Sequence, residues 1–561
     1  MSKKTNPPSS HDALALGQTH EVLNQPTALE GRNLYEDDQG IQDALHREGG
    51  GEYEEQVANY GAIAGGELME AGFLANENLP VLHTHDRFGH RRDEVTFHPA
   101  YHRAMELGIT HGLTSLTWTG GKGARVARSA LIYLHAQGEA GTQCPLTMTH
   151  AAIPSLREQP EVAEKWEPLI LANKYDKRFI AADQKEGVTI GMAMTEKQGG
   201  SDVRANTTVA NPIGQPGPGQ WYELVGHKWF VSAPMCDAFL TLAQTDKGLT
   251  CFLLPRWTPD GEKNRFHLQR LKNKLGNRSN ASSEAEYLGA KAVMVGEEGR
   301  GVATIIQMVG ETRLDCIIGS AALIRQAVVQ AIHYCGGRKA FGNYLVDQPL
   351  MKNVLADLVL EAEASIALGM RMARAHEAAD SNEQEALLAR IATAAGKYWV
   401  CKRAPLAVNE AQECLGGAGY IEESILPRLY REAPVNAIWE GSGNVQCLDV
   451  LRAMSKHPGT LDALFAEFAT AEGADPRFDR FVGDLKESFS DQSQIQLRSR
   501  RIVEKVALAL QATVLINGGN DALADAFCAS RLDGDAGLMF GTLPAGAAID
   551  ELVERGRPKT D

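Results

Sequence analysis

The sequence lacks the features that mark several classes of protein. Its nine cysteines include no C-x-x-C pair, which argues against a zinc cage and against a disulfide framework. The first twelve residues are polar and contain no apolar run of the kind found in a secretory signal. No stretch reaches the roughly 18 consecutive apolar residues that a membrane span requires. We therefore expect a soluble protein of the reducing cytoplasm, with no membrane partner.

Positive charge is also scarce. The 56 lysines and arginines are outnumbered by 71 aspartates and glutamates, which leaves a net charge of −15. A chain of this charge repels polyphosphates and acidic membranes as a whole, so any contact with a nucleic acid must be local. With 561 residues, of which 43% are hydrophobic and 23% charged, the chain has a globular composition and is too long for one core, so we expect several domains.

A metal site is not expected either. His98 and His102 have the i, i+4 spacing of a metal-binding pair, but the sequence shows no third ligand beside them. A structural or surface role explains these histidines better, and the sequence predicts no metal.

The hydrophobic pattern changes along the chain. Apolar residues at helical spacing dominate as far as residue 186, and short alternating or apolar runs separated by turn-forming residues replace them from 187 to 297. Helical spacing returns from 298 to 455 and continues, with mixed character, from 456 to 561. Gly518-Gly519 predicts a break in the last of these helical segments. The sequence thus predicts an N-terminal helical domain, a β-domain, a second helical domain and a helical C-terminal extension.

Five short motifs follow one another through the predicted β-domain and the second helical domain. Each of them alone is ordinary, because a Gly-Gly-Ser-Asp segment is usually a turn and a glycine cluster usually ends a helix. The motifs are TEKQGGSD at residues 195–202, GHKWFVS at 226–232, RKAFG at 338–342 followed by Gln348, LGGAGY at 415–420 and IWEGSGNVQ at 438–446.

In this order, the motifs resemble T-E-x-x-x-G-S-D, G-x-K-x-W-I-[ST], R-x-x-F-G-x-x-x-x-x-Q, L-G-G-x-G-Y and I-Y-E-G-T-x-x-I-Q of the acyl-CoA dehydrogenase family. Three sequence segments resemble the AidB type within that family: MTEKQGGSD at 194–202, KLGNRSNAS at 274–282 and WEGSGN at 439–444. The resemblance implies a mainly α fold with a central β-domain, the acyl-CoA dehydrogenase fold, extended by C-terminal helices. It also implies noncovalently bound FAD.

The resemblance further implies which residues touch FAD. The fork of an arginine suits a pyrophosphate, and in the family the arginine and phenylalanine of the third motif reach the FAD of a neighbouring subunit, so a homotetramer is expected. The implied FAD contacts are Met192, Met194, Thr195, Ser201, Phe230, Val231, Ser232, Arg338, Phe341, Gln348, Gly416, Gly417, Trp439, Gly441, Ser442 and Asn444.

The family's reaction needs one carboxylate base, because a proton leaves the α-carbon of an acyl thioester while hydride passes from the β-carbon to the flavin. Glu440 occupies the family's position for that base. Some branched-chain members instead carry the base just before an arginine, but the residue before Arg313 is Thr312, so Glu440 is the candidate catalytic residue. Trp439 and Ser442 replace the usual tyrosine and threonine. An alternative therefore stays open, in which Glu440 is a structural carboxylate of a flavin-binding protein that does not turn over a substrate.

A basic stripe on the C-terminal extension points to a second ligand. Arg498, Arg501 and Lys505 share one face of a predicted helix, and Arg452 extends the patch. The resemblance to AidB-type proteins implies double-stranded DNA as a partner, and we expect this stripe to contact its phosphates. A merely solvated helix face explains it equally well.

Two functions therefore remain open. One is that of an AidB-type flavoprotein that binds DNA, protects it in the response to DNA alkylation and oxidises isovaleryl-CoA weakly. The other is that of an ordinary acyl-CoA dehydrogenase acting on a short branched acyl-CoA.

Overall fold

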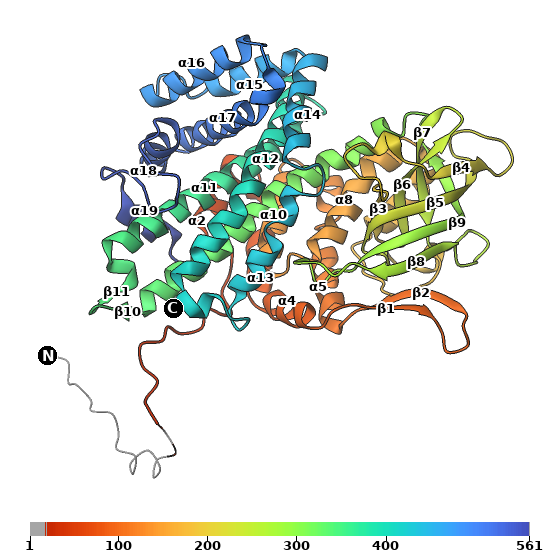
Figure 1. Ribbon diagram of the computed structural model, residues 1–561, viewed down its shortest axis with the longest axis horizontal. Helices are drawn as coiled ribbons and strands as arrows, with labels where there is room; N and C mark the ends of the chain where they lie inside the picture. Colours follow the sequence, from red (N-terminus) through yellow and green to blue (C-terminus); the bar gives the residue numbers. More distant parts are fainter. Residues whose placement is uncertain (1–16, 18, 560–561) are drawn as a thin grey trace.

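The computed structural model describes residue 17 and residues 19–559, so the polar start of the chain, residues 1–12, lies outside the described part. Helices fill one side of the molecule and a β-domain lies at the other (Figure 1). This arrangement confirms the predicted fold class, which is mainly α with a central β-domain.

The N-terminal part is helical, with one exception that the sequence analysis did not predict. Strands β1 (Val81–His85) and β2 (Arg91–Thr96) form an antiparallel hairpin. Its turn is closed by Asp86, whose carboxylate accepts hydrogen bonds from the amides of Phe88 and His90 at 2.8 and 2.9 Å. The helices are α2 (Gln39–Arg47), α3 (Glu54–Gly65), α4 (Glu67–Glu77), α5 (Pro99–Thr110), α6 (Leu116–Thr119), α7 (Ala124–Gly138), α8 (Gln143–Arg157) and α9 (Pro160–Ile170).

The β-domain is built from one seven-stranded sheet with the order β3-β6-β4-β5-β9-β7, in which β8 pairs with β9. Strand β7 also pairs with β6, so the sheet closes on itself. The strands are β3 (Ile190–Ala193), β4 (Val209–Pro212), β5 (Trp221–Ser232), β6 (Ala238–Thr245), β7 (Gly248–Pro255), β8 (Phe266–Leu271) and β9 (Ser282–Val295). The buried residues of the sheet form one hydrophobic core with residues of α8 and α9.

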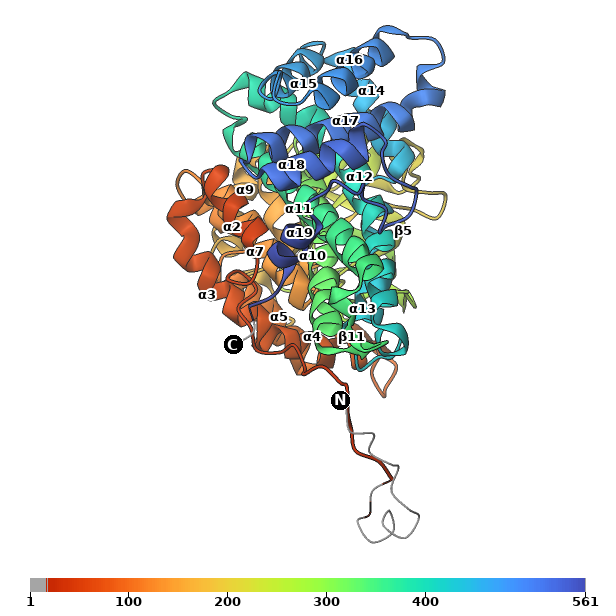
Figure 2. The same cartoon turned by 90° about the vertical axis from the view of Figure 1, so that its left-hand side faces the viewer.

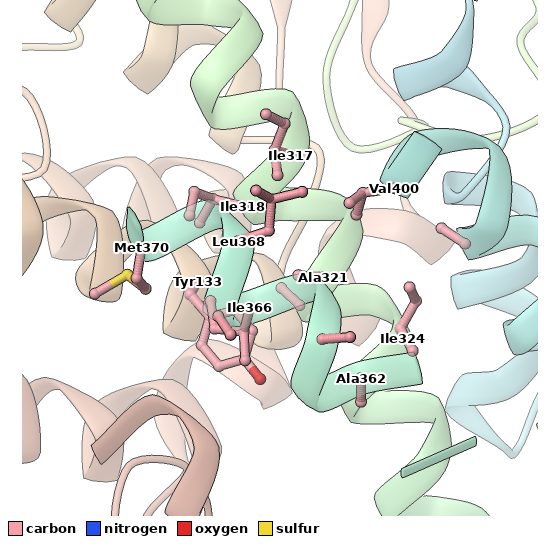
Figure 3. Packing of buried hydrophobic residues seen from close by; sticks show 14 of the residues in the cluster. Tyr133, Ile317, Ile318, Ala321, Ile324, Ala362, Ile366, Leu368, Met370 and Val400 are labelled. Carbon is pink, nitrogen blue, oxygen red and sulfur yellow. The ribbon is translucent and has the colours of Figure 1, made fainter. Parts of the chain in front are cut away.

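Three long helices form the centre of the second helical domain: α10 (Gly301–Gly337), α11 (Pro349–Ala378) and α12 (Glu383–Cys414). Figure 3 shows Ile317 and Ile318 of α10 packed near Leu368 of α11, with Val400 of α12 beside them. One 18-residue window of α10 has a mean hydropathy of 1.3, enough by length and composition to cross a membrane, and 89% of that window is buried inside the protein. The apolar character of α10 therefore matches its place in the core.

After α10, a short hairpin of β10 (Lys339–Ala340) and β11 (Asn343–Tyr344) leads into α11. The remaining helices of the chain pack around α11 and α12 (Figures 1 and 2). They are α13 (Ile425–Glu432), α14 (Gly443–Lys456), α15 (Gly459–Ala469), α16 (Pro476–Ser490), α17 (Ile495–Asn517), α18 (Asp521–Phe527) and α19 (Ile549–Gly556). Helix α17 ends just before Gly518-Gly519, where the sequence predicted a break.

Candidate functional site

A buried ion pair joins the first two motifs. Glu196 follows β3, Lys228 lies on β5, and their side chains, both fully buried, are 2.9 Å apart. The Glu196 carboxylate also accepts hydrogen bonds from the backbone amides of Thr207 and Thr208 at 2.7 and 3.1 Å. Burial acts to raise the pKa of Glu196, but the charge of Lys228 and these hydrogen bonds hold it well below its ordinary value. The pair fixes the loop after β3 against β5.

The predicted FAD contacts of the β-domain gather around this pair. The amide of Trp229 donates to the carbonyl of Thr195 at 2.8 Å, which ties the first motif to the second. Ser201 is exposed, and the Phe230 side chain leaves 48% of its surface exposed, whereas Val231 is buried. Gly199 has a φ of 129°, and nothing lies within 4 Å of where a Cβ would stand, so a ligand can approach this backbone closely.

The fifth motif meets the β-domain through Trp439. Its ring packs against the core of the β-domain, as do Met192 and Met194. Burial raises the pKa of the Cys144 thiol on α8 to about 12, and the nearby Glu440 carboxylate acts in the same direction. The turn that carries Glu440 therefore lies at the junction of the helical and β-domains.

The backbone of this turn is held in a conformation that only a few residue types adopt readily. Glu440 has a φ of 56°, in the left-handed region, which costs roughly 1–3 kcal/mol for a residue with a side chain. The buried ammonium of Lys397 donates to the carbonyls of Trp439 and Gly441 at 2.8 and 2.9 Å, and Gln446 donates to the carbonyl of Glu440 at 3.0 Å. Arg313 donates to the same carbonyl at 3.1 Å. These contacts offset the strain and fix the direction of the Glu440 side chain.

The Glu440 carboxylate points toward α10. The hydroxyl of Thr312 donates to its Oε2 atom at 2.6 Å. Burial raises the pKa of Glu440 above its ordinary value, while this hydrogen bond and the charges of Lys397 and Arg313 act in the opposite direction. The arrangement thus holds a carboxylate whose affinity for protons is increased, as a base requires.

A second carboxylate on α10 is engaged elsewhere. Glu311 forms an ion pair with Arg125 and lies 3.4 Å from the ring of His150. Burial alone would raise the pKa of Glu311, but the charge of Arg125 holds it well below its ordinary value. Glu311 is thus a stable anion within an ion-pair cluster and unsuited to the role of a proton acceptor.

A separate cluster forms where α10 ends. Arg338, Gly416 and Gly417 line one cavity of about 460 Å³. Gln348 donates to the carbonyl of Ala340 at 3.0 Å and so braces the β10–β11 hairpin. At the tip of that hairpin, the Phe341 side chain leaves 97% of its surface exposed.

Helix α10 separates this cavity from Glu440. Thr312 touches Glu440 in the first third of the helix, and Arg338 follows its last residue. At about 1.5 Å of rise per residue, the two positions are about 40 Å apart along the helix. This separation exceeds the length of one extended FAD molecule. The predicted FAD contacts therefore form two groups that one cofactor cannot touch within one subunit.

The predicted basic stripe is partly engaged. The Arg498 side chain contacts Asp491, and Arg452 contacts Asp449 at 3.4 Å. The Lys505 ammonium lies 5.5 Å above the ring of Phe481. Arg501 is exposed and has no carboxylate within 4.0 Å in the part of the chain that the structure describes.

The histidines that suggested a metal pair have structural roles. The ring of His98 accepts a hydrogen bond from the amide of Ala100 at 3.2 Å and caps α5, and the ring of His102 lies 2.7 Å from the hydroxyl of Tyr175. Among residues 19–559, no three His, Cys, Asp or Glu side chains come together as metal ligands would.

Sequence reasoning missed Lys397 as a site residue. The signal was present, because a single lysine stands in the otherwise apolar stretch of α12 between Ala394 and Cys401. A lysine at a buried helical position is rare and requires nearby acceptors, which the turn around Glu440 provides.

Comparison with known proteins gives matches along most of the chain. Residues 24–177 match the N-terminal domain of the adaptive response protein AidB. Residues 191–288 match the middle domain of acyl-CoA dehydrogenases, and residues 299–455 match their C-terminal domain.

Individual relatives agree with these matches. AidB of Escherichia coli (strain K12), which is described as an acyl-CoA dehydrogenase, is 45% identical over 93% of this chain and 96% of its own length. Acyl-CoA dehydrogenase family member 11 of Caenorhabditis elegans is 32% identical over 71% of this chain and 66% of its own length. The crystal structure of Caenorhabditis elegans ACDH-11 in complex with C11-CoA superposes with a TM-score of 0.83 at 26% identity, over 92% of this chain and 95% of that chain.

Proposed function

Since the chain belongs to the acyl-CoA dehydrogenase family, as an AidB-like member, we propose that it oxidises an acyl-CoA with Glu440 as the base. Members of this family are FAD-dependent flavoproteins, and FAD is the cofactor. The observation that carries the proposal is the contact between Thr312 and Glu440. The two positions at which the family places its base face each other here, and only one of them holds a carboxylate.

Bound FAD supplies the acceptor for hydride from the β-carbon of the acyl group. The protein contributes a base of fixed direction. Its raised pKa lets Glu440 take the α-proton, and the Thr312 hydroxyl keeps the carboxylate oriented during that transfer. Trp439, packed against the β-domain, closes the site toward the sheet and helps to exclude water.

Removing the Thr312 hydroxyl should change the pH dependence of the reaction. Glu440 must be ionised to act, so the rate of flavin reduction rises as the pH passes through the pKa of Glu440. The hydrogen bond from Thr312 acts to lower this pKa, so its loss in Thr312→Val should move the acidic limb of the pH–rate profile to higher pH. Rapid-mixing absorbance measurements of flavin reduction would give the profiles. Thr312→Ser keeps the hydroxyl and should retain the wild-type limb, and an unmoved limb in Thr312→Val would refute the role of this contact.

We also propose a homotetramer in which the cavity beside Arg338 receives the FAD of a neighbouring subunit. The distance along α10 supports this arrangement, because one FAD molecule cannot touch both groups of predicted contacts in one subunit. The exposed ring of Phe341, at the tip of a hairpin beside the cavity, supports it as well.

Binding of double-stranded DNA, protection in the response to DNA alkylation and weak oxidation of isovaleryl-CoA are further parts of the proposal, and they rest on the likeness to AidB. The exposed guanidinium of Arg501, without a carboxylate partner among the described residues, favours a phosphate contact on α17. A cytoplasmic location is proposed because all nine cysteines are free thiols.

If the stripe on α17 contacts DNA phosphates, binding should weaken steeply with salt and show little dependence on sequence. Replacing Arg498, Arg501 and Lys505 with alanine should flatten the slope of log K against log salt by about 0.9 per lost phosphate contact. Fluorescence anisotropy with labelled duplexes at several salt concentrations would measure it. A slope that stays the same in the triple variant would exclude the stripe.

One sample can test the two proposed activities together. FAD-loaded protein should be mixed with a series of short straight and branched acyl-CoAs while the visible absorbance of the flavin is followed, and the same preparation should be titrated with duplex DNA. Bleaching by a short acyl-CoA supports the oxidation, and protein that retains FAD without any bleaching would refute it.

A further inference from the structure

A segment near the N-terminus is attached to the end of α10. We call residues 24–27 the strap. The side-chain amide of Asn24 donates to the carbonyl of Lys339 at 2.9 Å and accepts from the amide of Lys339 at 2.7 Å. Asn24 has a φ of 59°, a left-handed conformation that asparagine tolerates better than most residues. The two-point contact fixes the strap in one register beside β10.

This register brings the strap onto Arg338. One guanidinium nitrogen, Nη1, donates to the carbonyl of Asn24 at 3.0 Å and to the side-chain oxygen of Gln25 at 3.3 Å. The guanidinium also lies 5.8 Å above the ring of Tyr334. No carboxylate lies within 4.0 Å of Arg338 in residues 19–559, and its remaining N–H groups donate to no protein acceptor there. The strap thus holds Arg338 in place without neutralising it.

The free side of Arg338 faces a space of suitable character. Gln25 and Arg338 line the cavity of about 460 Å³ together with Gly416 and Gly417. Glu413 also lines this cavity but forms no ion pair with Arg338. Gly416 has a φ of 58°, and nothing lies within 4 Å of where a Cβ would stand on either glycine. A cation without a partner beside open backbone is the combination that accommodates a phosphate group.

We propose that Asn24 and Gln25 are positioning residues of the FAD pyrophosphate site and that they preset the guanidinium of Arg338 for a two-point phosphate contact. This inference rests on the proposed binding of FAD in the cavity. An arginine that is already oriented loses less side-chain freedom on binding, so the strap should raise the affinity for FAD. The strap lies in the part of the chain that matches AidB, whereas Arg338 lies in the acyl-CoA dehydrogenase part, so the first serves the second.

The test places a negative charge beside Arg338. In Gln25→Glu, the new carboxylate should pair with Arg338 and repel the pyrophosphate, which should weaken FAD binding about 10- to 100-fold, most strongly at low salt. Gln25→Ala removes only the contact and should weaken binding a few-fold, while Arg338→Ala should weaken it about as much as Gln25→Glu. Full-length apoprotein would be titrated with FAD and followed by flavin fluorescence.

Ala28→Glu is the matched control, because it adds the same charge to the adjoining exposed residue without reaching Arg338. It should bind FAD with wild-type affinity. A purely structural role predicts that Gln25→Glu leaves the FAD affinity unchanged, whereas the proposal predicts that the affinity falls. Thermal unfolding of each apoprotein checks that a lower affinity does not come from loss of the fold. Wild-type affinity in Gln25→Glu would overturn the inference alone, whereas wild-type protein that takes up no FAD would overturn the proposed function with it.

Discussion

Replacing Glu440 with glutamine should slow the reduction of the flavin by an acyl-CoA by about 10²- to 10⁴-fold or abolish it, while FAD stays bound. Glutamine has almost the same volume and can still accept a hydrogen bond from Thr312, but its amide cannot take the α-proton. The backbone of the turn depends on Lys397, Gln446 and Arg313 and remains held in the variant. The rate would be measured by rapid mixing under conditions that allow one turnover.

The control for this variant is Glu410→Gln on α12. Burial also raises the pKa of Glu410, but this carboxylate contributes nothing to the turn around Glu440. The flavin of the Glu410→Gln variant should be reduced by an acyl-CoA at the wild-type rate. Unchanged reduction in Glu440→Gln would show that the base lies elsewhere.

Replacing Lys228 with methionine should reduce the free energy of unfolding by about 3–5 kcal/mol, because it leaves the Glu196 carboxylate buried without its partner. Glu196 and Lys228 hold the first two motifs together, so the variant should also lose FAD. Unfolding in urea followed by circular dichroism would measure the stability, and the visible absorbance after gel filtration would measure the retained FAD. Lys247→Met removes the exposed partner of an ion pair with Glu298 in the same domain and should reduce the stability much less.

The pH dependence of the stability lost in Lys228→Met identifies the cause of this loss. In the wild type, the pKa of Glu196 is lower in the folded state than in the unfolded chain, so its stabilising contribution is present above the unfolded pKa of about 4.3 and is lost as the pH falls through the folded pKa. In Lys228→Met, burial without a partner raises the folded pKa, so the variant gains stability as the pH falls and Glu196 becomes protonated. The difference between the two proteins should therefore narrow toward acidic pH. Adding Glu196→Gln to the variant should restore part of the stability, and no restoration would argue against the buried charge as the cause.

The sequence predicted some structural elements and site residues and missed others. The strands of the β-domain follow from their alternating and apolar runs, and the end of α17 follows from Gly518-Gly519. The hairpin of β1 and β2 was missed, because its strands are short and partly exposed and carry no strong apolar signal. Hydrophobic patterns therefore predicted strands that are buried along their length. They failed to predict a hairpin whose strand pairing depends on the turn at its tip.

The candidate site shows the same division. The motifs predict Glu440 as the base, and the absence of a carboxylate at Thr312 is visible in the sequence. That the two side chains touch could not be predicted, because 128 positions separate them and only the packing of α10 against the turn before α14 brings them together. The contact between Gln25 and Arg338 spans 313 positions and is equally a product of the tertiary fold.

The burial of every cysteine has a practical consequence for spectroscopy. All nine thiols lie inside the folded protein, so a reagent that alkylates surface thiols should leave the native chain almost unlabelled. A single cysteine introduced at exposed Ala28 would then carry a fluorophore or spin label as the sole probe, without prior removal of the natural cysteines. Such a label would report directly whether the neighbouring segment moves when the nucleotide arrives.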